Sequence, residues 1–162
     1  MSDPKRKNVF ISHVHEDDEW LPKLKDLCAG AGMAVRDYSI NSEKPNNAND
    51  PDYIKREILR PRIEGSSTLV VLINHDTASS DWVNWEIDVA RELGKTIVGV
   101  FARGATGADM PEALRECGDA AVVGWHSERV VAAINGELRE WDDPETGEAR
   151  APEWEMARVR CQ

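Results

Sequence analysis

The sequence predicts an α/β protein with a five-stranded, mainly parallel sheet in the flavodoxin-like order 2-1-3-4-5 and helices on both faces. Short apolar runs alternate along the chain with segments of helical periodicity. The strongest run, Thr68–Ile73, holds consecutive aliphatic residues and is apolar on both faces, as a central parallel strand is. Right-handed crossovers favour an order in which the chain reverses direction between strands one and three.

The first strand and helix lie near the N-terminus. Residues 9–12 form a short apolar run that ends at Ser12-His13, which predicts a buried strand. Apolar residues then recur at helical spacing over residues 20–28, and glycines follow at positions 30 and 32, where a helix would stop. Residues 33–38 return to an extended pattern and predict the second strand.

A long polar loop is expected after the second strand. Residues 39–51 contain four asparagines, two prolines and almost nothing apolar. Because connections of this kind usually hold about 2 to 6 residues, the length favours a binding segment over a plain connector. A helix is then expected over residues 52–63, with Pro61 kinking or fraying its final turn.

The second half of the chain continues the alternation of strands and helices. A helix is expected from Asp81 to Leu93, because Ser79, Ser80 and Asp81 cap helix N-termini well and Gly94 is a stop signal. The other predicted elements, in order, are a strand at Thr96–Phe101, a loop over 103–109, a short helix over 111–117, a weak strand over 120–123 and a helix over 127–141.

Composition indicates one acidic domain. A chain of 162 residues suits a single domain, which we expect over residues 1–141, followed by an acidic C-terminal tail over residues 142–162. The formal charge of −10 and the isoelectric point near 4.9 argue against nucleic acid or an anionic membrane as the main partner, because both require a basic face.

Cysteines and hydropathy bear on the compartment. The chain has three cysteines at wide, irregular spacing, which is typical of reduced thiols in a cytosol. The basic N-terminus has no apolar run behind it that is long enough for a signal peptide, and no segment approaches the ~20 apolar residues of a membrane span. We therefore expect a soluble, cytoplasmic protein.

One carboxylate is out of place on the helix that follows Thr68–Ile73. Trp82, Glu86 and Val89 fall on one stripe of that helix, so Glu86 interrupts an apolar face. Partial burial raises the pKa of a carboxyl group and makes it useful in chemistry. The predicted topology also puts this helix beside the carboxyl ends of strands one and three, where open α/β sheets bind ligands. Glu86 is therefore a predicted functional residue.

Several other chemistries lack their motifs. Residues 12–18 contain no glycine, which disfavours phosphate-binding loops and dinucleotide fingerprints. A phospho-receiver requires an aspartate where Asn74 stands, and a serine hydrolase requires a G-x-S-x-G elbow that is absent from the sequence. His13 and His15 alternate on a loop without a nearby cysteine, so no metal site is predicted.

Four motifs in order resemble the TIR-like domain family. They are Phe10-Ile11-Ser12-His13 followed by Glu16-Asp17-Asp18, then Asp37-Tyr38-Ser39-Ile40, then Pro51-Asp52-Tyr53-Ile54, and Trp82-Val83-Asn84-Trp85-Glu86. The resemblance covers about residues 7–140. It is closest to the stand-alone bacterial branch that includes ThsB of Thoeris antiphage systems. The most specific part is Ser80-x-Trp82-x-x-x-Glu86 following a buried strand.

The resemblance implies an activity. Enzymatic members of the family cleave the nicotinamide–ribose bond of NAD⁺ with the matching glutamate, which implies that Glu86 is catalytic and that NAD⁺ is a substrate, with no cofactor and no metal. The expected substrate contacts are Ser12, His13, Asp37, Ser39, Asn74 and Trp82. Ser12 and Asn74 are equally suited to satisfying backbone groups at strand ends.

The resemblance also implies partners. ThsB-type members release a cyclic or otherwise modified ADP-ribose, a diffusible signal that activates an effector protein, so an effector, a phage trigger and a homo-oligomer are expected. Whether the product is cyclic depends on whether water or an internal nucleophile captures the ribosyl cation, and the sequence leaves that open. The alternative is a non-catalytic adaptor that uses the same fold to bind another protein.

Overall fold

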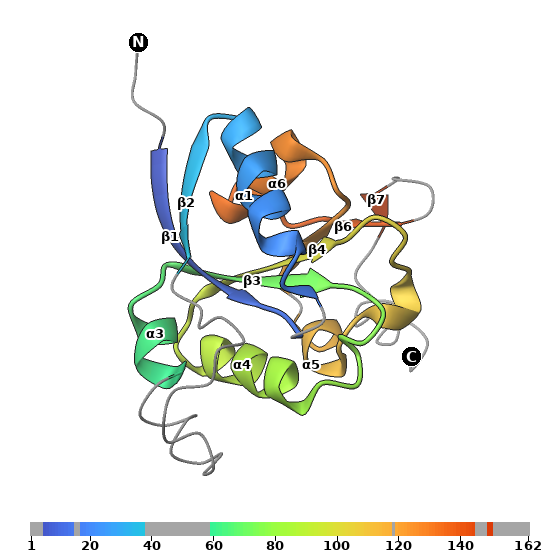
Figure 1. The fold of residues 1–162 in the computed structure, drawn as a ribbon. Coiled ribbons are helices and arrows are strands. Elements are labelled where there is room, and N and C mark those ends of the chain that lie inside the picture. Colours follow the sequence, from blue (N-terminus) through green and yellow to red (C-terminus); the bar gives the residue numbers. More distant parts are fainter. Residues whose placement is uncertain (1–4, 15–16, 38–58, 118, 145–148, 151–162) are drawn as a thin grey trace.

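A computed structural model describes residues 5–14, 17–37, 59–117, 119–144 and 149–150 of the chain. Its centre is one sheet in the order β2-β1-β3-β4-β5-β6-β7, with helices on both faces (Figure 1). The first five strands are parallel and follow the expected order 2-1-3-4-5, so the predicted fold class is confirmed. Two further short strands extend the sheet beyond the five expected.

The elements have the following bounds. The strands are β1 (Lys5–Ser12), β2 (Met33–Asp37), β3 (Thr68–Ile73), β4 (Thr96–Phe101), β5 (Ala121–Val123), β6 (Trp141–Asp142) and β7 (Ala149–Arg150). The helices are α1 (Trp20–Gly30), α3 (Arg60–Glu64), α4 (Asp81–Glu92), the single 3₁₀ turn η3 (Gly107–Asp109), α5 (Glu112–Arg115) and α6 (Ser127–Ile134).

Strand β1 begins at Lys5, four residues before the apolar run that predicts it. Its first half pairs with β2, from Lys5 opposite Met33 to Val9 opposite Asp37. Its second half pairs with β3, from Val9 opposite Thr68 onward. The apolar run thus marks only the half of β1 that pairs with the central strand β3, and the charged start of the strand, which pairs with β2, was missed for that reason.

The side chains of the central strands alternate between two cores. On one face, Leu69 and Val71 of β3 pack against α3, α4 and α5. On the other face, Val70 and Leu72 pack against α1 and α6. In Figure 1, α1 and α6 lie above the sheet while α3, α4 and α5 lie below it. This double coverage explains why β3 reads as a continuous apolar run.

The C-terminal part of the described chain differs from the prediction. The expected helix over residues 127–141 ends at Ile134, because Gly136 turns the chain with a φ of 77°. Trp141 then lies in β6, where it is fully buried and its Nε1–H donates to the carbonyl of Ala120 at 2.8 Å. Trp141, which the sequence pattern placed at the end of a helix, therefore belongs to the sheet.

The helix expected over residues 52–63 lies largely outside the described residues. What is described there is α3, which has Pro61 at its start and Gly65 as its C-cap residue. Pro61 lies in the first turn of this described helix, where proline is tolerated, and the part of the expected helix that would show a kink lies outside the described residues. The predicted loop over residues 39–51 also lies outside the described residues.

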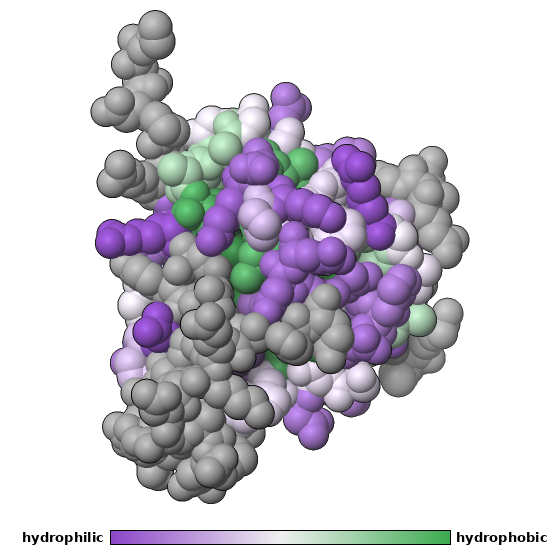
Figure 2. Space-filling view, viewed as in Figure 1, coloured by the Kyte–Doolittle hydropathy of each residue, from purple (hydrophilic) through white to green (hydrophobic). Residues whose placement is uncertain are grey.

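Hydrophilic residues cover most of the described surface in the view of Figure 2, as the acidic composition predicts. No helix of the described residues has both the length and the apolar character needed to span a bilayer.

Candidate active site

Helix α4 is held at its N-terminus by local hydrogen bonds. The Ser80 hydroxyl caps the helix by accepting a hydrogen bond from the Val83 N–H at 3.2 Å. Asn84 Nδ2 donates to the Ser80 carbonyl at 2.9 Å, and Asn84 Oδ1 accepts from the Ala113 N–H at 3.0 Å, which ties α4 to α5. These contacts set the rotation of α4 against the sheet.

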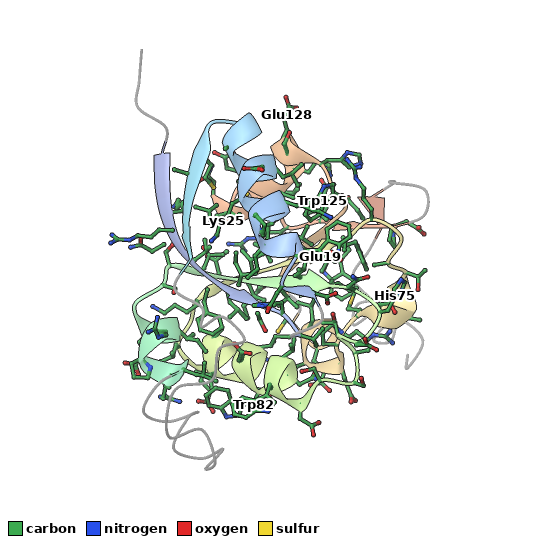
Figure 3. All side chains as sticks on the ribbon, in the orientation of Figure 1. Glu19, Lys25, His75, Trp82, Trp125 and Glu128 are labelled. Atoms are coloured by element: carbon green, nitrogen blue, oxygen red, sulfur yellow. The ribbon has the colours of Figure 1, made fainter. Side chains whose placement is uncertain are left out.

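That rotation buries the Glu86 side chain, which is 7% exposed and packs among the residues of α4 that face the sheet. Val83 and Ile87 are its fully buried neighbours on the helix. Trp82 is 38% exposed and points away from the sheet at the outer side of α4 (Figure 3). Trp85 is partly buried against the core. The prediction that Glu86 is desolvated is confirmed, and Val89 of the predicted stripe is buried with it, but Trp82 is not.

The environment of Glu86 changes its acidity. Burial raises its pKa well above the ordinary value of 4.5, and the Ser12 hydroxyl opposes this with a smaller lowering effect. Ser12 is the last residue of β1 and is fully buried. Although it lies near enough to influence Glu86, its hydroxyl makes no hydrogen bond of good geometry among the described residues. The carboxyl and the hydroxyl therefore lie together at the carboxyl end of β1.

A second pair of side chains joins the ends of β1 and β3. Asn74 follows β3, and its Nδ2 donates to Oδ1 of Asp17 at 2.8 Å. The Asn74 N–H donates to Thr77 Oγ1 at 2.8 Å, and the Thr77 hydroxyl donates to the Leu72 carbonyl at 3.2 Å. Asp17 and Thr77 are 6% and 0% exposed. The network fixes the loops after β1 and β3 relative to each other.

His13 is held by its own loop. Its Nδ1 lies 3.0 Å from the Ile11 carbonyl, and its Nε2 lies 2.7 Å from Asp18 Oδ1. The side chain is 6% exposed. Because both ring nitrogens have protein partners, His13 orders the loop after β1 in this structure.

The remaining predicted contacts are less defined. Asp37 ends β2, the strand next to β1, which puts its backbone at the same edge of the sheet as Ser12. Ser39 lies outside the described residues. The structure thus brings Ser12, Asn74 and Glu86 to one edge of the sheet, with His13 beside them and Trp82 on the outside of α4.

Sequence reasoning missed Asp17, Thr77 and Asn84 as structural members of this region. Asp17 sits in the acidic run 16–18, which resembles a solvated surface, and only the pairing of β1 with β3 brings it to Asn74. Asn84 looks like an ordinary polar helix residue. A signal was available for Thr77, since a threonine shortly after a buried strand often bonds to the strand-end backbone.

Among the described residues, no group of three or more histidine, cysteine, aspartate or glutamate side chains is arranged to hold a metal ion. A buried carboxyl beside a buried hydroxyl, at the carboxyl ends of parallel strands, can instead stabilise positive charge on an organic ligand and accept hydrogen bonds from it.

The chain is similar in sequence to a curated relative. A protein of Cytobacillus dafuensis named as a cyclic ADP-D-ribose synthase, TIR2, is 32% identical over 98 residues, which is 56% of this chain. The match covers 24% of that relative, so the chain spans about a quarter of the relative's length.

Solved structures also align with the chain. The TIR domain of the Toll-related receptor TRR-2 of Hydra magnipapillata aligns with 67% of this chain and 78% of its own, at 21% identity and a TM-score of 0.45. The CMP N-glycosidase BcmB of Clostridium botulinum aligns with 82% of this chain and 100% of its own, at 15% identity and a TM-score of 0.49.

A family model gives the assignment. The model described as the TIR-like domain of Thoeris protein ThsB matches residues 10–106, which is more than half of the chain and contains the end of β1, all of α4 and Glu86. The chain belongs to the ThsB TIR-like domain family.

Proposed function

We propose that this protein cleaves the nicotinamide–ribose bond of NAD⁺ and releases a cyclic or otherwise modified ADP-ribose. The single observation that carries the proposal is the buried Glu86 carboxyl beside the Ser12 hydroxyl at the carboxyl ends of β1 and β3. The name of the Cytobacillus dafuensis relative, a cyclic ADP-D-ribose synthase, supports the same reaction class.

In this proposal Glu86 acts through charge. Cleavage of an N-glycosidic bond passes through an oxocarbenium-like transition state, which an adjacent carboxylate stabilises. Burial raises the pKa of the Glu86 carboxyl and so favours its neutral form. The nicotinamide ring of NAD⁺ is a cation, and an adjacent cation lowers a carboxyl pKa. Binding of NAD⁺ therefore favours the ionised form of Glu86 where the cation develops.

The other predicted contacts orient the substrate. Ser12 has a hydroxyl without a hydrogen-bond partner among the described residues, and it is available to a ribose hydroxyl. Asp37 ends β2, Asn74 follows β3 and Ser39 lies in the segment after β2, and all three are proposed to contact the nucleotide. His13 lies beside the site, whereas Trp82 lies on the outer side of α4 and would reach the nucleotide only from there. NAD⁺ is the substrate, and the proposal includes no cofactor and no metal.

The biological setting follows from the reaction. The ADP-ribose product is a diffusible signal that activates an effector protein in antiphage defence, and a phage trigger and self-association bring the enzyme to its active state. Cytoplasmic NAD⁺ is the expected substrate pool. Glu86 is fixed within the fold, so these steps act by giving NAD⁺ access to it.

The test incubates the protein with NAD⁺ and follows free nicotinamide by chromatography, with and without lysate from phage-infected cells. Release by the wild type is expected, with a loss of ~10² to 10⁴ in rate for Glu86→Gln. Asp88→Asn, an exposed carboxylate on the same helix, is the matched control and retains activity. No release under either condition, or equal release by Glu86→Gln, contradicts the proposal. Mass spectrometry of the product separates hydrolysis from cyclisation.

A non-catalytic adaptor is the second candidate, and the exposure of Trp82 favours it. An indole that is 38% exposed on the outer side of α4 presents apolar surface that another protein can contact. The adaptor predicts a complex that persists in Glu86→Gln, is lost in Trp82→Ala, and forms without any turnover of NAD⁺.

A further inference from the structure

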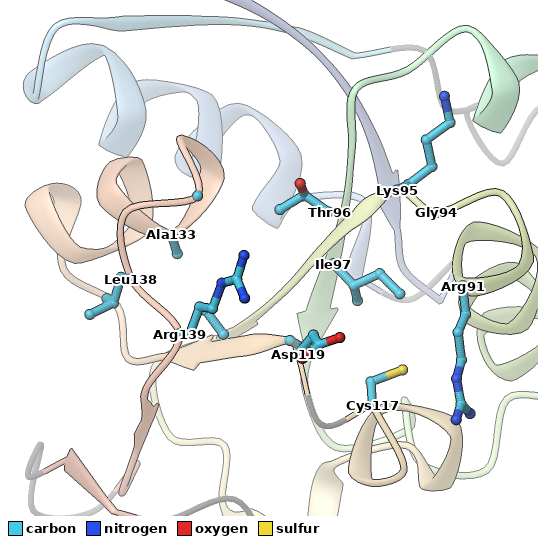
Figure 4. Close-up of a pocket in the computed structure, with 13 residues that line it drawn as sticks. Arg91, Gly94, Lys95, Thr96, Ile97, Cys117, Asp119, Ala133, Leu138 and Arg139 are labelled. Atoms are coloured by element: carbon cyan, nitrogen blue, oxygen red, sulfur yellow. The ribbon is translucent and has the colours of Figure 1, made fainter.

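A cavity of about 300 Å³ lies at the end of the sheet opposite to Glu86 (Figure 4). Its floor is the start of β4 and β5, where Thr96 and Ala121 stand, while Ser12 and Asn74 mark the other ends of the strands. Helices α4 and α6 both end at its walls. The cavity is therefore separate from the proposed active site, and this inference does not rest on the proposed function.

The charge of this cavity is opposite to that of the chain. The whole protein has 30 acidic and 20 basic residues. The lining of the cavity contains three basic residues, Arg91, Lys95 and Arg139, and a single acidic one, Asp119. A basic site on an acidic protein concentrates anions locally while the rest of the surface repels them.

Two of these cations have no partner in the described part of the protein. Arg91 and Arg139 form no side-chain hydrogen bond or ion pair there. Arg60 and Arg129, by contrast, form ion pairs with carboxylates elsewhere on the surface. A guanidinium presents a planar set of donors that matches carboxylate and phosphate oxygens. Figure 4 shows Arg139 extending toward β4 and Arg91 running along the end of α4 past Cys117.

Compensation of helix dipoles is the simpler explanation, since cations near helix C-termini are stabilising. The ends of both helices, however, already have partners in the backbone. The Lys95 N–H donates to the Ala90 carbonyl at 2.9 Å after α4, and the Glu137 N–H donates to the Ala132 carbonyl at 2.9 Å after α6. Lys95 Nζ donates to the Glu64 carbonyl at 2.9 Å. Arg91 and Arg139 are thus available for a ligand.

Small residues create the space between these cations. The walls include Gly94, Gly136, Ala120 and Ala133, none of which fills the volume with a long side chain. A volume of about 300 Å³ is at the lower end for small-molecule sites. Asp119 at the rim can accept a hydrogen bond from a hydroxyl or amino group, so a ligand with both an anionic end and a donor fits the lining.

We propose that this cavity binds a small organic anion, whose carboxylate or phosphate group pairs with Arg139 and whose hydroxyl groups contact Asp119. The probes are inorganic phosphate, glycerol 3-phosphate and glycerate, titrated at constant ionic strength and followed by backbone amide NMR. Saturable shifts are expected at Thr96 and Ala121 and not at Ser12 or Asn74. Glycerol 3-phosphate binding better than glycerate identifies the group as a phosphate, and the reverse order identifies a carboxylate.

Variants distinguish a site from general attraction. Arg139→Ala is expected to weaken binding by about 10-fold or more, because a charged hydrogen-bonded pair is lost. Arg103→Ala removes an exposed arginine outside the cavity and is the matched control, with less than a 2-fold effect expected. Arg139→Lys keeps the charge but not the planar donors. Its loss of binding is expected to lie between the losses of Arg103→Ala and Arg139→Ala. Glu86→Gln leaves binding unchanged, which separates this site from the active site.

The proposal is overturned if none of the three probes gives saturable shifts at the start of β4 and β5. It is equally overturned if Arg139→Ala and Arg103→Ala weaken binding to the same extent, since that result indicates attraction to the surface charge alone. Both variants lie at exposed positions, so their folding is checked by the dispersion of the same NMR spectra.

Discussion

The Ser12 hydroxyl at the end of β1 faces the buried Glu86 carboxyl of α4, and it is the one interaction that lowers the pKa of a group that burial raises. Both side chains are at least nine-tenths buried. A carboxyl in such a place costs stability when it ionises, because few groups nearby replace its water. A carboxyl that is expensive to ionise at such a position is a candidate for a functional role.

Glu86→Gln should make the protein more stable at high pH. Burial raises the Glu86 pKa well above 4.5, so between pH 4.5 and the native pKa the unfolded chain releases a proton that the folded chain keeps. The stability due to the neutral carboxyl is complete below pH 4.5 and is lost as pH rises through the native pKa. Glutamine does not titrate. Across that interval, the free energy of unfolding of Glu86→Gln should therefore rise relative to that of the wild type by about 1.4 kcal/mol per pH unit.

The measurement is urea denaturation at a series of pH values from 4 upward, with Asp88→Asn as the control. Asp88 is exposed on the same helix, so its variant should follow the pH dependence of the wild type. Parallel curves for Glu86→Gln and the wild type would show that Glu86 is not desolvated in the folded protein.

Ser12→Ala should separate stability from activity. The hydroxyl is fully buried and has no hydrogen-bond partner among the described residues, so its removal should change the free energy of unfolding by less than about 0.5 kcal/mol. The same change at Ser66, whose hydroxyl donates to the Arg62 carbonyl at 2.8 Å, should cost about 1 kcal/mol.

Activity should show the opposite ranking. Nicotinamide release should fall in Ser12→Ala, because a ribose contact is lost and the Glu86 pKa rises further without the hydroxyl. Ser66→Ala should retain the rate of the wild type. Equal activity of the two variants would remove Ser12 from the substrate site.

The sequence predicted the burial of Glu86 and the order of the central strands better than it predicted the outer parts of the sheet. Burial of Glu86 follows from local periodicity and capping, since Ser80 fixes where α4 starts. The order of the first five strands follows from alternation and handedness, which are general rules. The position of Trp141 in a strand could not be predicted in this way, because β6 has only two residues and is too short to show a periodic pattern.

Contacts between segments that are distant in the chain could also not be predicted from the sequence alone. The hydrogen bond from Asn74 to Asp17 joins residues 57 positions apart, and it exists only because β1 and β3 are neighbours in the sheet. From the sequence, Asp17 could be recognised only as part of the acidic motif at residues 16–18. Such pairs can be predicted only once the strand order and register are known, because the type of either residue does not reveal its partner.

Asn84→Ala should loosen α4 from α5. The side chain accepts from the Ala113 N–H at 3.0 Å and donates to the Ser80 carbonyl at 2.9 Å. Ala113 is 6% exposed, so its N–H would lose its partner with little access to water. We expect a loss of about 1 to 3 kcal/mol in the free energy of unfolding.

Asn135→Ala is the control for this change, because it removes an asparagine side chain that caps no neighbouring element in the described structure. Urea denaturation should show a loss below about 0.5 kcal/mol for the control. A loss in Asn84→Ala that is no larger would mean that the bridge between α4 and α5 contributes little.

Arg129→Ala should be the most damaging change at the C-terminal edge of the sheet. Arg129 Nε donates to Asp142 Oδ2 at 2.7 Å, and Asp142 is 1% exposed. The carboxylate partners raise the pKa of the Arg129 guanidinium, mainly through its hydrogen bond to Asp142. Truncation leaves a buried carboxylate with only the Gly124 N–H, at 3.3 Å, as a described donor.

The expected loss is about 2 kcal/mol, below the 3–5 kcal/mol of fully buried pairs, because the Arg129 side chain is 34% exposed. Arg60→Ala, which breaks only exposed pairs with Glu64 and Glu92, should lose less than about 1 kcal/mol. The double variant Arg129→Ala with Asp142→Asn should recover part of the loss, since it removes the unpaired charge. Failure to recover would mean that Arg129 stabilises β6 by packing and not through its charge.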